Sequence, residues 1–220
     1  MPTICPDLAT AVAGIGDGAT IMVGGFGQAG MPGGLLSALL DTGATGLTII
    51  SNNAGQGDNP LGALFREGRV ARIVCSYPRT SGSVWFEKRW AEGAVALDLV
   101  PQGTLAERMR AAGAGLGGFF TPTGYGTEIA EGKETRVIDG RGHVLEAPLG
   151  ADVALIRAEV ADRWGNLRYR ATARNFNPVM AMAGRLVVVQ ARRLSDAPLD
   201  PETIVTPGIY VDRVAVLDER

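Results

Sequence analysis

Residues 17–32 constrain this chain more than any other segment, because they join an apolar strand to a helix through a loop almost free of side chains. The stretch reads Asp-Gly-Ala-Thr-Ile-Met-Val-Gly-Gly-Phe-Gly-Gln-Ala-Gly-Met-Pro. Glycine permits positive φ angles and a close approach to the backbone, and Pro32 suits the first turn of a helix, whose free N–H groups favour an anion. The loop therefore predicts a ligand that carries a phosphate or a thioester.

Strands and helices alternate along the first half of the chain. The predicted strands are residues 20–24, 47–51, 70–75 and 95–100, and the predicted helices are residues 32–40, 61–67, 84–92 and 104–112. Strands rich in Val and Ile, bounded by Gly and separated by helical periods, are typical of βαβ units. The pattern predicts an α/β fold with a mainly parallel sheet and helices on both faces. Shorter strands are predicted in the second half, near residues 136–139, 143–147, 153–158 and 186–190.

Composition limits the number of domains and the kinds of partner. A chain of 220 residues with 46% hydrophobic content can bury one sizeable core, so we expect a single domain over residues 1–220. The 21 basic and 23 acidic residues give a net charge of −2 without a basic block, which argues against nucleic acid. With no apolar run of about 18 residues and no cationic apolar leader, we expect a cytoplasmic protein that does not bind membranes.

Cysteine and histidine offer little chemistry in this chain. Cys5 and Cys75 have neither the spacing of a metal site nor that of a disulfide framework, so we expect buried thiols and no metal. A nucleophilic Cys75 at the end of a strand is the weaker interpretation, because no histidine follows it nearby. The one histidine, His143, is a poor basis for a catalytic triad or a metal site.

A dinucleotide site is the first alternative, since the loop also contains G-x-G-x-x-G at Gly25, Gly27 and Gly30. Such a site needs an acidic residue about 20 positions later, at the end of the second strand, to hold the ribose hydroxyls. The strand at residues 47–51 ends instead in Asn52-Asn53. This difference removes the main support for a dehydrogenase.

The loops that follow the predicted strands are expected to meet. In a parallel sheet the ligand crevice lies at the carboxyl ends of the strands. The Gly-rich loop, Asn52-Asn53, residues 77–79 and residues 101–103 all leave strands at that edge. Residues 114–126 depart from helical periodicity and indicate an ordered functional loop or a subunit contact.

Several motifs resemble the alpha (A) subunit of the family I coenzyme A transferases. The signature Asp-Gly, two residues, three apolar residues, Gly-Gly-Phe, three residues, Gly, one residue, Pro is filled at every position of residues 17–32. Further blocks are similar to the same family and cover nearly the whole chain: residues 51–55, 101–108, 121–127, 131–135, 173–178 and 204–208.

The resemblance implies the family's isomerase-like α/β fold and half of an enzyme. Family members transfer CoA by a ping-pong reaction in which a glutamate forms a glutamyl-CoA thioester. That glutamate lies in a Ser-Glu-Asn-Gly block of the beta subunit, and no Ser-Glu-Asn occurs here. The implied partner is therefore a beta (B) subunit in an α2β2 assembly, with a CoA thioester as substrate and no tightly bound cofactor. Glu107 lies in a helical pattern and is expected to be solvated or ion-paired.

The resemblance also implies roles for individual residues. Gln102 lies in the block where the family keeps an oxyanion-hole glutamine, although it could merely cap the following helix. The Gly-rich loop is expected beside the CoA thioester, and its residues are Gly24, Gly25, Phe26, Gly27, Gln28, Ala29 and Gly30. Asn52 and Asn53 either bind the active-site loops or the partner's glutamate, or are plain turn residues. Arg174 is expected to support the second half of the fold or an interface.

Substrate preference follows from two further blocks. Residues 75–79 and 162–166 look closest to the 3-oxoadipate type of the family, which implies succinyl-CoA as donor, 3-oxoadipate as acceptor and a place in aromatic catabolism. Arg79 could bind the distal carboxylate of the acceptor, or lie exposed at the surface. The alternatives are an acetate, acetoacetate or other 3-oxo acid transferase, a non-catalytic acyl-CoA-binding subunit, and a sugar-phosphate isomerase on the same architecture.

Overall fold

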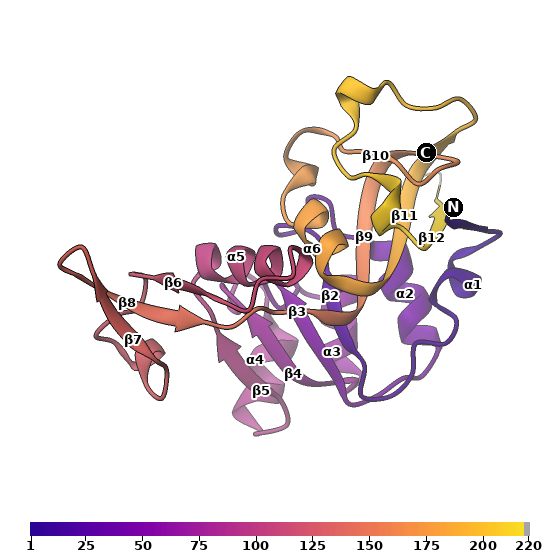
Figure 1. The fold of residues 1–220 in the computed structure, drawn as a ribbon. Coiled ribbons are helices and arrows are strands. Elements are labelled where there is room, and N and C mark those ends of the chain that lie inside the picture. The colour runs from indigo at the N-terminus through magenta and orange to yellow at the C-terminus, as the bar shows by residue number, and fades with distance from the viewer. Residues whose placement is uncertain (218–220) are drawn as a thin grey trace.

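A nine-stranded β-sheet forms the centre of the computed structural model, which describes residues 1–217 (Figure 1). Its strands follow the order β1-β12-β11-β9-β2-β3-β4-β5, all parallel, and the short β10 pairs antiparallel with β9. The bounds are β1 Thr3–Cys5, β2 Thr20–Val23, β3 Leu47–Ser51, β4 Val70–Cys75, β5 Ala96–Leu99, β9 Ala151–Asp162, β10 Leu167–Arg168, β11 Gly184–Ser195 and β12 Arg213–Val216.

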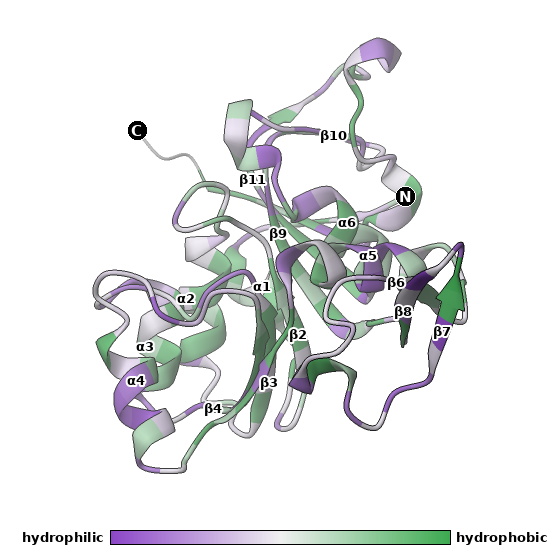
Figure 2. Cartoon of the chain, turned by 90° about the vertical axis from the view of Figure 1, so that its left-hand side faces the viewer, coloured by the Kyte–Doolittle hydropathy of each residue, from purple (hydrophilic) through white to green (hydrophobic). Residues whose placement is uncertain are grey.

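Helices cover both faces of this sheet, as predicted (Figure 2). One layer contains α1 Leu8–Val12, α2 Gly33–Asp41, α3 Pro60–Arg66 and α4 Val84–Ala91. The other contains α5 Gln102–Gly113 and α6 Asn177–Ala183, which pack on each other. Within residues 1–217, none of these helices is long and apolar enough to cross a lipid bilayer.

The hydrophobic core has two parts, one on each face of the main sheet, because side chains alternate along each strand. Ile21 and Val23 of β2 pack under α1 to α4, whereas Met22 packs under α5 and α6. The same alternation separates Ile49 from Ile50 on β3. Because successive side chains of a strand point to opposite faces, a continuous apolar run fills both cores at once.

The alternation predicted over residues 20–112 is confirmed, with most boundaries within two residues. Two elements before it, β1 and α1, are not predicted from the sequence. The three-residue β1 has no pattern of its own and pairs with β12 at the other end of the chain, so its existence depends on a long-range contact. The last predicted helix begins two residues earlier than expected, at Gln102.

A second, antiparallel sheet projects from the main body after α5 (Figure 1). It has the order β6-β8-β7, with β6 Phe119–Thr121, β7 Thr135–Ile138 and β8 Arg141–Glu146, and the 3-10 turn Glu128–Ala130 precedes β7. The carboxylate of Glu146, only 2% exposed, accepts a hydrogen bond from Lys133 Nζ at 2.6 Å and lies 3.9 Å from Arg108 of α5. The contact with Arg108 ties the small sheet to α5, and the contact with Lys133 joins β8 to the segment before β7. Part of the segment expected as a loop is therefore a strand.

The second half of the chain extends the main sheet by its two longest strands. The short strands predicted at 153–158 and 186–190 are the middles of β9 and β11, which pair over most of their length. The helix-like run that the block at residues 173–178 precedes corresponds to α6. The remaining elements of this half, β10, β12 and the 3-10 turns Ala171–Arg174, Pro201–Thr203 and Gly208–Tyr210, are not predicted from the sequence. They span only two to four residues, so their periodicity carries little signal.

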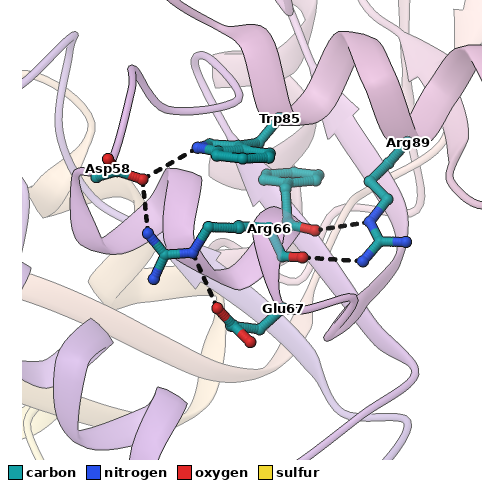
Figure 3. A network of polar contacts seen from close by, with 6 residues as sticks. Asp58, Arg66, Glu67, Trp85 and Arg89 are labelled. Carbon is teal, nitrogen blue, oxygen red and sulfur yellow. Dashed lines mark hydrogen bonds and ion pairs between the residues drawn. The ribbon is translucent and has the colours of Figure 1, made fainter.

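A polar network joins α3 to α4 on the outer layer (Figure 3). Asp58 accepts hydrogen bonds from Arg66 at 2.6 Å and from the Trp85 indole at 3.1 Å, and Arg66 also donates to Glu67 at 2.9 Å. The guanidinium of Arg89 donates to two backbone carbonyl groups at the end of α3 at 2.8 and 3.1 Å. Arg89 thus provides a donor to the Arg66 carbonyl at the end of the helix and a second donor to the Phe65 carbonyl, which also accepts from the N–H of Gly68 at 3.0 Å.

Candidate active site

Four loops meet at the carboxyl edge of the sheet, as expected from the parallel strand order. They follow β2, β3, β4 and β5, and together they enclose a cavity of about 460 Å³. Its lining residues are Phe26, Gly27, Asn52, Asn53, Ser76, Tyr77, Thr80 and Gln102. The predicted convergence of these loops is therefore confirmed. Ser76 belongs to the block at residues 75–79 but is not singled out within it, and Thr80 has no signal in the sequence beyond its position after a strand.

The side-chain amide of Gln102 is bonded to that of Asn52, whose oxygen accepts two hydrogen bonds. The side-chain nitrogen of Gln102 donates to the amide oxygen of Asn52 at 2.7 Å, and the hydroxyl of Ser76 donates to the same oxygen at 2.9 Å. A primary amide has two N–H groups. One of those of Gln102 is used by Asn52, and the other has no partner among residues 1–217 and is available at the cavity.

The two asparagines form hydrogen bonds within the loops of the site, and contact with a partner's glutamate stays a prediction. Both are buried. The amide oxygen of Asn53 accepts from the N–H of Gly55 at 2.9 Å, as in a turn, while the carbonyl of Asn52 accepts from the N–H of Tyr77 at 3.0 Å. Asn52 therefore fixes the loops after β3 and β4 to each other, and Asn53 closes the turn after β3. Both also line the cavity.

The amino end of α5 opens beside the same site. Gln102 is its first residue, and no side chain among residues 1–217 caps the N–H groups of its first turn. The neighbouring Gly103 lines a second cavity of about 350 Å³, which also contains Phe26, Gln102, Ala106, Asn175, Phe176 and Val179. Free N–H groups at a helix amino end favour negative charge. This twelve-residue helix places that end next to the amide of Gln102.

The amino end of α2, in contrast, is not available to a ligand. The expectation that it would bind an anion after the Gly-rich loop is not met. The N–H of Leu35 donates at 3.2 Å to the amide oxygen of Gln190 on β11, and both residues are buried. The protein's own side chain therefore takes the place that a phosphate would need.

The Gly-rich loop forms a tight turn that presents an aromatic ring. The N–H and carbonyl groups of Phe26 and Ala29 bond to each other at 3.0 and 3.1 Å, and Gly27 between them has φ +59°. The ring of Phe26 is 52% exposed and lies between the two cavities. A large apolar side chain held in this way by a rigid turn is available to a ligand or a partner.

The block at residues 173–178 lies at the site, which the sequence does not reveal. The sequence predicts support for the second half of the fold or for an interface, and it singles out Arg174. Asn175 and Phe176 line the second cavity instead, and Asn175 donates to the carbonyl of Ala29 at 2.8 Å. The signal that could have found them is the pair of asparagines around an aromatic residue in a motif of the resembled family.

Arg79 lies away from the lining of both cavities. Its guanidinium carbon is 5.5 Å from the centre of the Trp90 ring, in a cation–π contact with α4. The neighbouring residues Tyr77 and Thr80 do line the larger cavity. A role for Arg79 in binding a carboxylate therefore stays a prediction.

Neither Cys75 nor His143 offers a nucleophile or a base to the site. Burial raises the pKa of the Cys75 thiol to about 12, so the thiol is neutral near pH 7. His143 lies on β8 of the small sheet with Nδ1 2.8 Å from the carbonyl of Arg141. Glu107 forms an ion pair with Arg110 at 2.7 Å, as expected. No carboxylate of residues 1–217 is among the residues that line the two cavities.

The block at residues 162–166 builds a turn. Burial acts to raise the pKa of the Asp162 carboxyl, but hydrogen bonds from the side chain of Asn166 and from the N–H groups of Leu199, Asn166 and Trp164 outweigh it and lower the pKa. The turn connects β9 to β10. Neither cavity contains a residue of this block, so any effect on substrate preference would be indirect.

Known proteins are similar to this chain over nearly its whole length. The sequence model of the family described as "Coenzyme A transferase" matches residues 6–217. The chain is 58% identical over 211 residues to the A subunit of the 3-oxoadipate CoA-transferase of Pseudomonas putida, covering 96% of this chain and 91% of the relative. It is 48% identical over 212 residues to the A subunit of the succinyl-CoA:3-ketoacid coenzyme A transferase of Xanthomonas campestris pv. campestris (strain B100), covering 96% and 87%.

A solved structure shares the fold. The acyl-CoA transferase of Escherichia coli O157:H7, in a thioester complex with CoA, superposes with a TM-score of 0.86 at 24% identity. The superposition covers 100% of this chain and 48% of that polypeptide, so the same fold occurs as about half of a longer chain. The predicted fold class is confirmed by this similarity.

Proposed function

The chain belongs to the coenzyme A transferase family, and we propose that it is the A subunit of a two-subunit enzyme that moves CoA from succinyl-CoA to 3-oxoadipate. The observation that carries this proposal is the cavity at the carboxyl edge of the sheet, which has amide groups at Gln102, Asn52 and Asn53 but no carboxylate. Amides can stabilise a developing negative charge without changing their protonation state. They cannot replace the nucleophile of the reaction.

The nucleophile is then a glutamate of the B subunit, which the family resemblance implies. Its carboxylate attacks the thioester carbonyl of succinyl-CoA, the C–S bond breaks, CoA leaves as a thiolate, and a mixed anhydride of glutamate and succinate is formed. The thiolate attacks the glutamyl carbonyl of the anhydride, which releases succinate and leaves glutamyl-CoA. The acceptor carboxylate repeats the two steps in reverse and departs as its CoA thioester. Both relatives are named as A subunits, which supports a partner of this kind.

Gln102 acts in each attack by donating a hydrogen bond to the carbonyl oxygen as it becomes negative. The N–H that is not used by Asn52 is the donor, and Asn52 keeps the Gln102 amide in place. The open amino end of α5 adds a favourable field for the same negative charge. The apolar side chains of Phe26, Phe176 and Val179 in the second cavity would contact the uncharged arm of CoA.

Acceptor identity is tested by transfer from succinyl-CoA in the reconstituted A and B subunits. We expect kcat/KM for 3-oxoadipate to exceed that for acetoacetate and for acetate by at least about tenfold, or about 1.4 kcal/mol of transition-state binding. A preference for acetoacetate or acetate would reassign the enzyme within its family. No transfer to any acid would reject the proposal of a transferase for 3-oxo acids.

The same assay decides the role of Arg79. If its guanidinium leaves Trp90 and binds the distal carboxylate of 3-oxoadipate, Arg79→Ala lowers kcat/KM for this acid by roughly 10–100-fold and leaves acetoacetate within about twofold. Arg72→Ala, which removes an exposed arginine paired with Asp98, is the control and should change neither value. An unchanged ratio between the two acceptors in Arg79→Ala would exclude this role.

The remaining features of the proposal concern the assembly and its setting. We infer a single domain over residues 1–220, which one family match over residues 6–217 supports. An α2β2 heterotetramer, a cytoplasmic location and the absence of a tightly bound cofactor are further parts of the proposal. Sedimentation of the mixed subunits would measure the stoichiometry directly.

A further inference from the structure

We propose that Asn177 is a positioning residue that keeps the Gly-rich loop at a fixed position relative to Gln102. The inference rests on the proposed function, because it concerns the same site. Asn177 is the first residue of α6 and is completely buried. It does not line either cavity, so it would act through the loop and not on the substrate.

The amide of Asn177 is bonded on both ends to backbone groups. Its nitrogen donates to the carbonyl of Ala173 at 2.8 Å and to that of Gly30 at 3.1 Å, and its oxygen accepts from the N–H of Arg157 at 3.0 Å. Backbone carbonyl groups can only accept and a backbone N–H can only donate. The orientation of this amide is therefore determined, and it links the Gly-rich loop, the turn before α6 and strand β9.

Two glycines of the loop lie directly against this amide. A methyl group at Gly24 would overlap the Asn177 oxygen, and one at Gly30 would approach its nitrogen at 2.8 Å. Gly27 at the tip of the same loop has no atom within 4 Å of such a methyl. Glycine is thus required where the loop contacts Asn177, so the loop and this amide fit each other closely.

The segment around Asn177 also lies beside the cavity of the proposed catalytic amide. Phe176 lines the second cavity together with Phe26 and Gln102. Helix α6 packs on α5, of which Gln102 is the first residue. Asn177 holds the Gly-rich loop, which carries Phe26. If that loop shifted, the distance between Phe26 and Gln102 would change.

The backbone just before this segment is strained, which agrees with a position that the surrounding structure determines closely. Ala171 has φ +45°, in the left-handed region that residues with a side chain rarely adopt. Such conformations persist only where the surroundings determine them and are frequent at functional sites. Here the turn of residues 171–174 brings the Ala173 carbonyl to the Asn177 amide.

The test compares Asn177→Ala with Asn166→Ala in the reconstituted enzyme. Asn166 is a matched control, because its amide also bonds on both ends, to Asp162 at 2.9 Å and to the N–H of Gly208 at 2.9 Å, in a turn that contributes to neither cavity. We expect both variants to melt at a lower temperature. In Asn177→Ala, kcat per folded molecule should also fall by roughly 10–100-fold, since a small misplacement of reacting groups is costly, whereas Asn166→Ala should keep kcat within about twofold.

Three outcomes would overturn the inference. They are an unchanged kcat in folded Asn177→Ala, an equal loss of kcat in Asn166→Ala, and a loss in Asn177→Ala that appears only as a higher KM for succinyl-CoA. If Asn177→Ala does not fold, Asn177→Ser, which keeps one donor, decides the question by the same criteria. Inactivity of the wild-type pair would instead count against the proposed function, so the two failures are distinguishable.

Discussion

Replacing Gln102 by alanine is expected to lower kcat by about 10²–10³-fold, the usual effect of removing one oxyanion-hole donor. The loss follows from the second side-chain N–H of Gln102, which lines the cavity, because that N–H has no partner among residues 1–217. The cavity itself should persist, because Asn52 keeps its bonds to the hydroxyl of Ser76 and the N–H of Tyr77. Binding of succinyl-CoA in the ground state should therefore change little. Steady-state kinetics of the reconstituted subunits would measure kcat and KM separately.

A substitution on the same helix gives the control for this prediction. Glu107 lies on α5 and is paired with Arg110 at the surface, so Glu107→Gln should leave kcat within about twofold. Gln102→Glu, which exchanges the donor for an acidic group, should be at least as inactive as Gln102→Ala. A decrease of less than about threefold in Gln102→Ala would show that another group stabilises the oxyanion.

Gly30→Ala is expected to destabilise the folded chain by about 2–5 kcal/mol. Gly30 has φ +74°, a conformation that costs an alanine roughly 1–2 kcal/mol. Its added methyl would also overlap the carbonyl of Ala173 and crowd the amide of Asn177, and overpacking of this kind typically costs about 1–3 kcal/mol. Denaturant unfolding of the purified chain would measure the loss.

The matched variant is Gly27→Ala in the same loop. Gly27 has φ +59°, but a methyl group added there would meet open space, so only the conformational cost of about 1–2 kcal/mol applies. The difference between the two variants therefore isolates the contact with Asn177 and Ala173. If Gly30→Ala and Gly27→Ala were equally destabilising, the steric contact with Asn177 and Ala173 would not explain why position 30 is a glycine.

The first half of the fold is predictable because its information is local. Strands β2 to β5 are rich in Val, Ile and Leu and each follows a glycine within three residues, and the helices between them have clear periods, so each element is visible in a short window. Parallel order then places the following loops at one edge. This reasoning is sufficient to bring Gln102, Asn52 and Asn53 together from the sequence, and all three line the same cavity.

What cannot be predicted depends on contacts between distant parts of the chain. Gln190 accepts a hydrogen bond at the amino end of α2 from Leu35, which lies 155 residues away in the sequence. No local pattern distinguishes that helix end from the uncapped amino end of α5. Asn177 reaches Gly30 from 147 residues away. A buried polar side chain is recognised only from its hydrogen-bond partners. Here those partners are backbone groups, which every residue type carries, so the sequence does not mark them.

The central claim is that this chain supplies the amide-lined half of an active site whose nucleophile lies on another subunit. The most direct measurement is CoA transfer from succinyl-CoA to 3-oxoadipate by the chain alone and by the chain mixed with its B subunit. We expect no transfer by the chain alone and rapid transfer by the mixture, with a glutamyl-CoA thioester recoverable from the B subunit. Transfer by the chain alone, or a thioester formed on one of its own residues, would contradict the claim.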